Sequence, residues 1–326
     1  MTHRPNRRLL AAAALLAGLV CVAPVHADSF PSRPISIVVP FGAGSGSDIA
    51  SRFYARSLKE LLGANAVVEL KPGAAGMLAG AFAARAAPDG YTVLMGSGTV
   101  NAANYPLFRD TIKYAPKDFD AVATVYVSPP LLFAGRTVAG EGLVELIAQA
   151  RAAQRRLSCG SGNAVTQVAC ELLRRKTGAD IVNVPYKGNG QSMTDLASGQ
   201  IDIAFSDMAA AGPFLQREGV RAVAVPAASR LPALPQVRTF AEQGIADFEF
   251  LSWNTIFVPA GTPAAVVRRL NEAARHMLAT EEWGRQRQAS SGLEVSGDLE
   301  EAKAFVTSEL ARWERYVRET GVKGGQ

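Results

Sequence analysis

A run of glycine and serine residues that ends in an aspartate lies between two apolar segments, at residues 42–48. Glycine lets a backbone adopt positive φ and approach a ligand closely. Residues 35–39 before the run are rich in β-branched side chains, which is typical of a buried strand. After it, apolar residues recur at helical spacing from Ile49 until Gly63 closes the pattern. The order is therefore strand, glycine loop and helix N-terminus, where the free N–H groups of the first turn attract an anion.

Other interpretations of this loop have to be weighed beside anion binding. Ser47 or Asp48 could simply cap the helix, with the glycines making a tight turn. A phosphate-binding P-loop is excluded because it needs Gly-Lys-Ser/Thr, which is absent. A dinucleotide-binding loop has the spacing G-x-G-x-x-G, whereas this one reads G-x-G-x-G. Glu69 nevertheless ends the next apolar run about where a ribose-binding acid would lie, so a dinucleotide-dependent enzyme remains a rival.

The same kind of junction recurs at three further points of the chain. Strand-like residues 92–95 run into Gly96-Ser97-Gly98-Thr99, residues 157–159 into Gly160-Ser161-Gly162-Asn163, and residues 201–205 into Ser206-Asp207. Ligands of open α/β sheets bind outside the carboxyl ends of the strands. Two lobes with such ends facing each other would form a cleft lined by N–H and hydroxyl donors, which suits a small carboxylate. The alternative is four ordinary βα turns, where these residue types are favoured anyway.

The N-terminal residues 1–27 have the three parts of a secretory signal peptide, namely three arginines, an apolar run and a small-residue cleavage site. We expect cleavage after Ala27 and export to the periplasm. The intact chain has a formal charge of +5, and cleavage would leave 31 basic and 29 acidic residues, a charge of +2. No basic cluster remains, so nucleic-acid binding is not indicated.

Few reactive side chains would remain after cleavage. His276 would be the one histidine, which leaves no Ser-His-Asp triad and no His-rich metal site. We therefore predict no catalytic residues, no metal and no cofactor. Cys159 and Cys170 do not make a disulfide framework. We interpret Cys170 as a helix core residue and expect no bridge, because a strand end would have to move against its own helix, although an exported protein permits one.

Strand-like and helix-like segments alternate through the rest of the chain, which indicates an α/β protein with mainly parallel sheets flanked by helices. The apolar run 250–259 is interpreted as a strand that crosses between lobes. Gly178 closes a helical pattern at residues 164–176, and Asp298 with Glu301 marks the acid-capped start of a long amphipathic helix, which we expect to pack on the first lobe. We predict one lobe from residues 28–127 and 251–326, and a second lobe from residues 128–250.

Seven motifs between Phe30 and Val322 together match one known family. They are Phe30–Ile35, Val38–Asp48, Lys71–Gly76, Ala87–Thr92, Val184–Gly188, Phe257–Pro263 and Arg312–Val317. With these motifs the chain resembles the substrate-binding proteins of tripartite tricarboxylate transporters, the TctC-like or Bug family of periplasmic receptors. The resemblance implies a two-lobed periplasmic-binding-protein (Venus-flytrap) fold that binds carboxylated solutes.

The family's ligand-binding loops can be carried over residue by residue. The resemblance implies ligand contacts from the first strand loop, the third loop and the start of the second lobe: Phe41, Gly44, Ser45, Gly46, Ser47 and Asp48; Ser97 and Thr99; Ser161, Asn163 and Thr166. Three features depart from the family pattern. The motif at the start of the second lobe reads Gly-Ser-Gly-Asn-Ala-Val-Thr-Gln, not the commoner Gly-Asn-Gly-Thr type with a following His. Ser45 replaces a common glycine, and Ser206-Asp207 is shifted by one from an acid that contacts an amino group in amino-acid-binding members. The role of Ser206 and Asp207 at the second end of the ligand therefore stays open.

These observations predict a receptor that is not an enzyme. It would capture a small organic acid between its lobes, act as a monomer, and deliver the acid to subunits of a tripartite tricarboxylate-type membrane transporter or to a sensor. The alternative is an exported hydrolase or a dinucleotide-dependent enzyme. The sequence does not name the acid.

Overall fold

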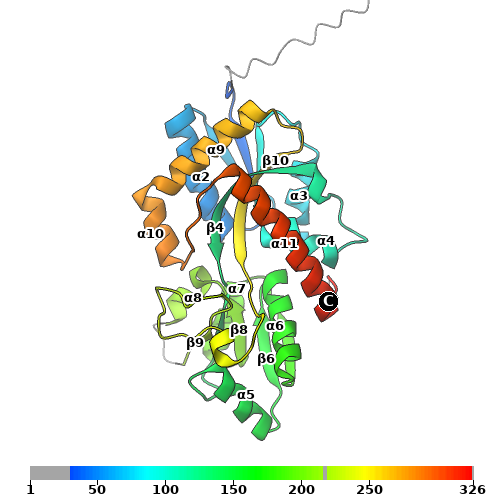
Figure 1. Ribbon diagram of the computed structural model, residues 1–326, viewed down its shortest axis with the longest axis vertical. Helices are drawn as coiled ribbons and strands as arrows, with labels where there is room; N and C mark the ends of the chain where they lie inside the picture. Colours follow the sequence, from blue (N-terminus) through cyan, green and yellow to red (C-terminus); the bar gives the residue numbers. More distant parts are fainter. Residues whose placement is uncertain (1–29, 216–218, 325–326) are drawn as a thin grey trace, which may run out of the picture. The chain divides into compact units, whose positions relative to one another are not determined.

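Two five-stranded sheets carry the described part of the chain, which in this computed structural model comprises residues 30–215 and 219–324 (Figure 1). The signal peptide predicted for residues 1–27 and its cleavage after Ala27 lie outside these residues. Within the described ranges, no helix combines the length and the apolar character needed to cross a membrane.

The two sheets have equivalent strand orders. The first sheet has the order β2-β1-β3-β10-β4, and the second has the order β7-β6-β8-β5-β9. In the first sheet the strands are β1 Ile35–Val39, β2 Ala66–Leu70, β3 Thr92–Ser97, β4 Phe119–Ser128 and β10 Ser252–Pro259. In the second they are β5 Leu131–Ala134, β6 Leu157–Ser161, β7 Ile181–Pro185, β8 Ile203–Ser206 and β9 Arg221–Ala224. The two-lobed α/β fold predicted from the sequence is confirmed.

Each sheet is mixed. The strands that are joined through helices pair in parallel, as β1 does with β2 and β3, and as β6 does with β7 and β8. The remaining pairs are antiparallel, because β10 and β5 run against their neighbours. The predicted parallel pairing therefore holds for the βα units, whereas the first strand after each crossing, β5 or β10, runs the other way.

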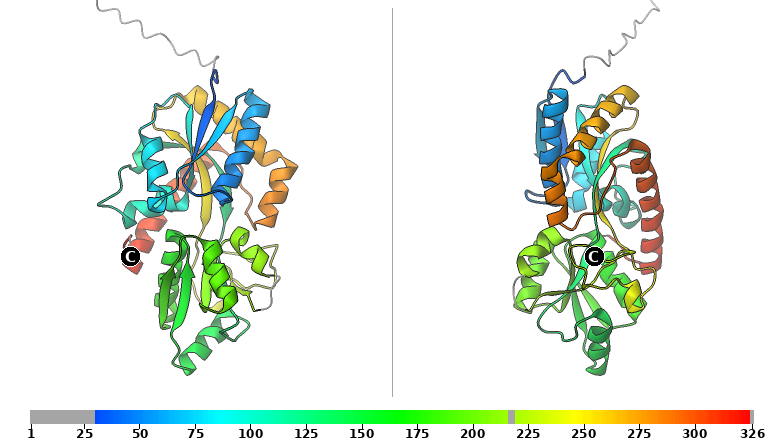
Figure 2. Two further views of the ribbon diagram at one scale, coloured as in Figure 1. Left: turned by 180° about the vertical axis from the view of Figure 1, so that it is seen from behind. Right: turned by 60° about the vertical axis from the view of Figure 1, so that its left-hand side comes forward.

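Helices cover the faces of both sheets. The α-helices of the described residues are α2 Gly46–Leu62, α3 Met77–Ala84, α4 Asn104–Leu107, α5 Leu143–Ala152, α6 Ala164–Thr177, α7 Asn189–Ser198, α8 Met208–Leu215, α9 Ala264–Ala279, α10 Glu281–Ala289 and α11 Leu299–Thr320. Short turns complete them: η2 Ala74–Gly76, η3 Thr99–Ala103, η4 Pro116–Asp118 and η5 Ala241–Gln243. Figure 2 shows α2 and α9 side by side on one face of the first sheet and α11 on the other.

Local signals explain where the main helices end and begin. Gly63 and Gly178 were predicted to end helices, and both adopt left-handed conformations with φ of 68° and 63° at the C-caps of α2 and α6. Asp298 caps α11 by accepting hydrogen bonds from the N–H groups of Glu300 and Glu301, at 2.9 and 3.1 Å. These capping residues therefore fix the helix limits that the sequence indicated.

The chain passes from one sheet to the other and back. β4 ends at Ser128 in the first sheet, and β5 begins at Leu131 in the second. The return path follows β9 and leads into β10 at Ser252. Residues 225–251 belong to no strand of either sheet, so the sheets do not assign them to a lobe. The lobe limits at 127/128 and 250/251 therefore stay our prediction.

The C-terminal helix α11 contacts elements of both sheets. It packs on β4 of the first sheet and on α6, which follows β6 of the second. Trp313 and Tyr316 are buried, and the Tyr316 ring stacks on Phe250 with centroids 4.4 Å apart. The side chain of Arg175 on α6 donates to the carbonyl of Thr320. The helix therefore packs on the first lobe, as predicted, and also contacts α6 of the second lobe.

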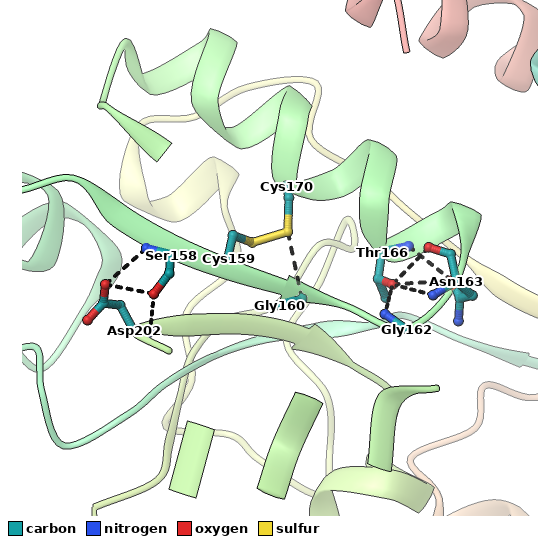
Figure 3. The surroundings of a disulfide bond; sticks show 8 residues. All are labelled: Ser158, Cys159, Gly160, Gly162, Asn163, Thr166, Cys170 and Asp202. Atoms are coloured by element: carbon teal, nitrogen blue, oxygen red, sulfur yellow. Dashed lines mark hydrogen bonds between the residues drawn. A yellow bond between two sulfur atoms is a disulfide. The ribbon is translucent and has the colours of Figure 1, made fainter. Parts of the chain in front are cut away.

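A disulfide joins Cys159 of β6 to Cys170 of α6, with Cα atoms 6.0 Å apart (Figure 3). Our expectation that these residues would not be bridged was wrong. The helix folds back over its own strand, and its second turn lies across the middle of β6, so the Cα separation falls in the usual range of about 4.4–6.8 Å without any movement. Both residues are buried, which confirms Cys170 as a core residue of the helix.

We expect exported protein to contain no free thiol. Alkylation of the folded, unreduced chain should leave Cys159 and Cys170 unmodified by mass spectrometry, and both should react after reduction and unfolding. Replacing both cysteines by alanine should lower the free energy of unfolding by about 2–4 kcal/mol, because the unfolded chain is no longer constrained. Wild type unfolded in reductant is the control and should match the variant. Two reactive thiols in the untreated protein would contradict the bridge.

The carboxylate of Asp202, the residue before β8, forms hydrogen bonds with Ser158 of β6. Ser158 donates to Oδ2 of Asp202 through its N–H and its hydroxyl, both at 2.9 Å (Figure 3). Thr137 donates to Oδ1 at 2.8 Å. The guanidinium of Arg155 also bonds Oδ1. Burial by itself would raise the pKa of Asp202, but these donors and the arginine charge outweigh it and hold the pKa below its usual range.

Asp202→Asn should therefore destabilise the protein in a pH-dependent way. A lowered pKa means that the folded state binds the proton more weakly, so the stabilisation is present above about pH 4 and is lost as pH falls through the folded-state pKa. We expect a loss of about 1–3 kcal/mol at neutral pH that shrinks in acid, measured by urea unfolding. Asp180→Asn is the control: its pair with Arg156 is exposed, so it should cost less than about 1 kcal/mol. A pH-independent loss for Asp202→Asn would refute this assignment.

Candidate functional site

The junction between β1 and α2 is closed by two reciprocal hydrogen bonds. Ser45 is the N-cap, and its hydroxyl accepts from the N–H of Asp48 at 3.3 Å. The carboxylate of Asp48 reaches back and accepts from the N–H of Gly44 at 2.8 Å. Ser47 and Asp48, which we had considered as caps, lie at the second and third helical positions. The N-cap therefore lies two residues before Ser47, because the helix already begins at Gly46.

The charge of Asp48 is balanced within the same helix. Its Oδ1 lies 2.9 Å from Nε of Arg52, one turn further on, and the arginine side chain is 60% exposed while that of the aspartate is 4% exposed. A carboxylate in the first turn also interacts favourably with the helix dipole. Asp48 therefore serves the loop's conformation, and its charge does not stand alone beside the helix N-terminus.

Two N–H groups at this N-terminus have no acceptor among the described residues. They belong to Gly46 and Ser47, the first two helical residues, while the N–H of Asp48 bonds the cap. Gly44 has φ of 77°, which favours glycine, whereas a side chain on Gly46 would meet only Oδ1 of Asn254, at 3.8 Å. An oxyanion could thus approach the N–H groups beside Gly46, where the backbone is uncovered.

A residue that the sequence analysis missed holds this junction to the neighbouring strand. The side-chain amide of Asn254, on β10, donates to the hydroxyl of Ser47 at 2.7 Å and to the carbonyl of Gly96 at 3.0 Å. Asn254 is buried, with 5% of its surface exposed. The available signal was an amide side chain inside the largely apolar run 250–259.

The loop after β3 lies beside it. The hydroxyl of Ser97 accepts from the N–H of Val100 at 3.2 Å, and Thr99 is buried at the start of η3. A side chain on Gly98 would come within 3.1 Å of Nε1 of Trp253, so this loop packs closely on the start of β10. Phe41 is half-buried and packs against the core. The structure therefore brings Ser47 next to the end of β3, whereas Ser97 and Thr99 serve the turn into η3.

The junction between β6 and α6 repeats the design of the first (Figure 3). Asn163 is the N-cap, and its side chain accepts from the N–H of Thr166 at 3.0 Å. The hydroxyl of Thr166 accepts in return from the N–H groups of Gly162 and Asn163, at 3.0 and 3.1 Å. The N–H groups of Ala164 and Val165 again have no acceptor within the described residues.

The last residue of β6 carries an unsatisfied hydroxyl. Ser161 is 2% exposed, and its Oγ is buried without a hydrogen-bond partner among the described residues. Such groups are rare because they lose hydration without compensation. The following Gly162 cannot carry a side chain, since a Cβ would lie 2.2 Å from the backbone N of Asn189. The start of α7 is thus packed directly on this loop.

The end of β8 is held by local bonds. Asp207 accepts from the N–H of Ala210 at 2.9 Å and from the side-chain amide of Asn189 at 2.7 Å. The hydroxyl of Ser206 is buried and donates to the carbonyl of Asp207 at 3.2 Å. Asp207 therefore caps α8 and fastens it to α7, and Asn189 is a second residue that the sequence analysis missed.

The predicted site residues thus form two groups, one at the carboxyl ends of β1 and β3 and one at those of β6 and β8. No hydrogen bond in the described part of the chain joins the groups. Tyr126 on β4 lies within electrostatic reach of the second group: burial raises the pKa of its phenol, and the negative charge of Asp207 adds to the rise. The Tyr126 hydroxyl donates to the carbonyl of Ser290 at 3.0 Å.

Glu69, which kept a dinucleotide-dependent enzyme in consideration, and His276 both have other partners. Glu69 accepts from the hydroxyl of Ser36 at 2.7 Å, and this bond, together with Lys71, holds the pKa of Glu69 below its usual range. Nε2 of His276 lies 3.3 Å from a carboxylate oxygen of Glu60, and both side chains are exposed. Neither residue has a bond to either group of predicted site residues.

Comparison with known proteins places this geometry among solute receptors. Residues 50–322 match the family described as tripartite tricarboxylate transporter family receptor, TctC. The chain is 31% identical to BugT of Bordetella pertussis over 308 residues, which cover 92% of this chain and 93% of that protein.

Solved structures agree with this match. A structure of Rhodopseudomonas palustris Rpa4515 with adipate has a TM-score of 0.81 and 31% identity, covering 90% of this chain and 98% of that one. MatC from Rhodopseudomonas palustris with bound malate has a TM-score of 0.78 and 30% identity, covering 88% and 100%.

Ser45→Ala tests the cap of α2. Losing the N-cap oxygen should lower the free energy of unfolding by about 1 kcal/mol, because the N–H of Asp48 loses its acceptor. Ser45→Asp is the matched control and should retain most of the stability, since aspartate is an equally good cap. Urea unfolding of the unliganded protein measures both. Equal losses in the two variants would show that Ser45 acts through something other than its side-chain oxygen.

Proposed function

Because the chain belongs to the tripartite tricarboxylate transporter receptor family, we propose that it is a periplasmic binding protein that captures a small organic acid and delivers it to the membrane subunits of such a transporter or to a sensor. The observation that carries this proposal is the matched pair of helix N-termini, one after β1 and one after β6, each with two N–H groups that have no acceptor within the described residues. The relatives solved with adipate and malate support a carboxylate as the ligand.

In this proposal one carboxylate of the acid binds at the N-terminus of α2. The N–H groups of Gly46 and Ser47 and the hydroxyl of Ser47 donate to its oxygens, and the helix dipole adds attraction. Gly44, Ser45 and Asp48 shape the loop. Phe41, Ser97 and Thr99 border the same end of the first sheet.

The second lobe receives the other end of the acid. The buried hydroxyl of Ser161 is available to donate to it, because it has no partner among the described residues. Asn163 and Thr166 position the N-terminus of α6 beside it, and Ser206 with Asp207 borders this end. Closure of the two lobes, 28–127 with 251–326 against 128–250, would bring the two groups onto one ligand and shield its hydrogen bonds from water.

We further propose that the protein is a non-catalytic monomer without a cofactor. His276 lies on α9 beside Glu60 and does not belong to either group of site residues, so the proposed site lacks the usual general base of a hydrolase. Neutral donors at helix N-termini bind an anion without activating it for reaction.

Ligand binding can be measured by thermal unfolding against a panel of mono-, di- and tricarboxylates. An acid at ~100 times its Kd should stabilise wild type by about 2.7 kcal/mol. Ser47→Ala should weaken binding about tenfold or more, because a hydrogen bond to a charged group contributes roughly 1.5–3 kcal/mol. Gly46→Val should also weaken it, since its side chain would cover the N–H groups, while the space around Gly46 lets the chain fold.

Each variant has a matched control. Ser57→Ala removes another buried hydroxyl of α2, which bonds the carbonyl of Ala273, and should change stability without changing affinity. Gly284→Val adds a side chain in open space on α10 and should change neither. Full ligand-induced stabilisation in both Ser47→Ala and Gly46→Val would mean that the loop is only a capped turn.

A further inference from the structure

We propose that Asn254 is a positioning residue of the binding site: it joins the two loops of the first sheet into one surface and directs the Ser47 hydroxyl toward the ligand. The inference rests on the proposed function, and it adds a residue that lies outside both loops. Asn254 is on β10, far along the chain from Ser47 and Gly96.

Both hydrogen atoms of the Asn254 amide are used. One goes to the hydroxyl oxygen of Ser47, at 2.7 Å, and the other to the carbonyl of Gly96, at 3.0 Å. Ser47 belongs to the junction of β1 and α2, and Gly96 belongs to the end of β3. A single buried side chain therefore bridges the two loops, and neither bond can be exchanged for water without exposing the residue.

The bond to Ser47 decides what that hydroxyl can do. A serine hydroxyl has one proton to donate, and its oxygen can accept. Because the oxygen already accepts from Asn254, the proton is directed to another acceptor. Ser47 lies at the second helical position, beside N–H groups that have no acceptor among the described residues, so a carboxylate oxygen there would receive all these donors together.

The strand around Asn254 is fixed by its register. Asn254 pairs with Ser97 in the antiparallel ladder of β10 and β3. Gly96 cannot carry a side chain, since a Cβ would lie 2.3 Å from Oδ1 of Asn101 and 2.5 Å from the ring of Phe257. The carbonyl of Gly96 thus has little freedom, and a bond to it anchors the amide firmly.

The second sheet lacks this device. Its strand β5 takes the place of β10, and Leu131 pairs with Ser206 where Asn254 pairs with Ser97. Leu131 is fully buried and belongs to an apolar cluster. The amide bridge is therefore specific to the first sheet, which makes the N-terminus of α2 the better organised of the two anion-binding ends.

This difference supplies the test variant. Asn254→Leu copies the residue of the second sheet and keeps the branching of the side chain, with two methyl groups in place of the amide, and Asn254→Asp places a negative charge beside the ligand. Affinities would be measured by calorimetry for the best acid of the carboxylate panel. We expect Asn254→Leu to weaken binding about tenfold or more, and Asn254→Asp to weaken it further.

Coupling through Ser47 is measured with the double variant. If Asn254 acts by orienting that hydroxyl, Ser47→Ala combined with Asn254→Leu should bind about as weakly as the worse single variant, so the effects are non-additive. Thr255→Val is the control, since it removes the buried hydrogen bond between Thr124 and Thr255, at 2.9 Å, from the next position of the same strand. It should lower the melting temperature and leave the affinity unchanged.

Hydrogen exchange of the unliganded protein gives an independent measurement. Asn254→Leu should speed exchange in both loops, residues 42–48 and 96–100, whereas Ser47→Ala should affect the first loop alone. Provided that wild type binds an acid, three outcomes would each overturn the inference. They are unchanged affinity in Asn254→Leu, additive losses of binding energy in the double variant, and faster exchange in only one loop of Asn254→Leu. Failure of wild type to bind any acid of the panel would instead overturn the proposed function, and the inference with it.

Discussion

The first N–H groups of an α-helix cannot be bonded within the helix, and this constraint shapes both ends of the proposed site. α2 and α6 meet it in the same way. The N-cap side chain takes the N–H of the third residue, and the third side chain takes an N–H from the loop before the cap. Two donors remain at each helix, held by a loop that is already bonded. An anion can bind there without ordering the backbone, and loop ordering is one of the costs of binding.

The carboxylates near these donors are compensated by partners in both lobes. Asp48 is paired with Arg52, whose side chain lies at the exposed side of the helix, and Asp207 is held by an N–H and by the amide of Asn189. The donors themselves are neutral. Neutral donors and helix dipoles stabilise a carboxylate by less than a buried arginine would, and they avoid the desolvation cost of a buried charge when no ligand is present. A receptor that must release its ligand benefits from such a site.

Local features could be predicted from the sequence because they depend on neighbouring residues. The four strand-loop-helix junctions, the glycines that end α2 and α6, and the cap at Asp298 are of this kind. The disulfide depended on how α6 packs back over β6, which no spacing reveals. The cap of α2 was misplaced because serine occurs at two positions of the loop. Asn254 and Asn189 were missed because their partners are distant in the sequence, although an amide in an apolar strand was a usable signal.

β10 connects the return crossing from the second sheet to the contacts that Asn254 and Trp253 make in the first. This strand enters the first sheet directly after the chain has left the second, and its first residues are Ser252, Trp253 and Asn254. Trp253 donates to the buried carboxylate of Glu309 on α11, at 2.9 Å, and packs on Gly98. Any rotation between the sheets must be absorbed just before these residues, since the residues themselves are held by bonds to two loops and a helix. In our proposal, the strand that returns from the second sheet is therefore also the strand that aligns the donors of the first, so closure and alignment would depend on the same few residues.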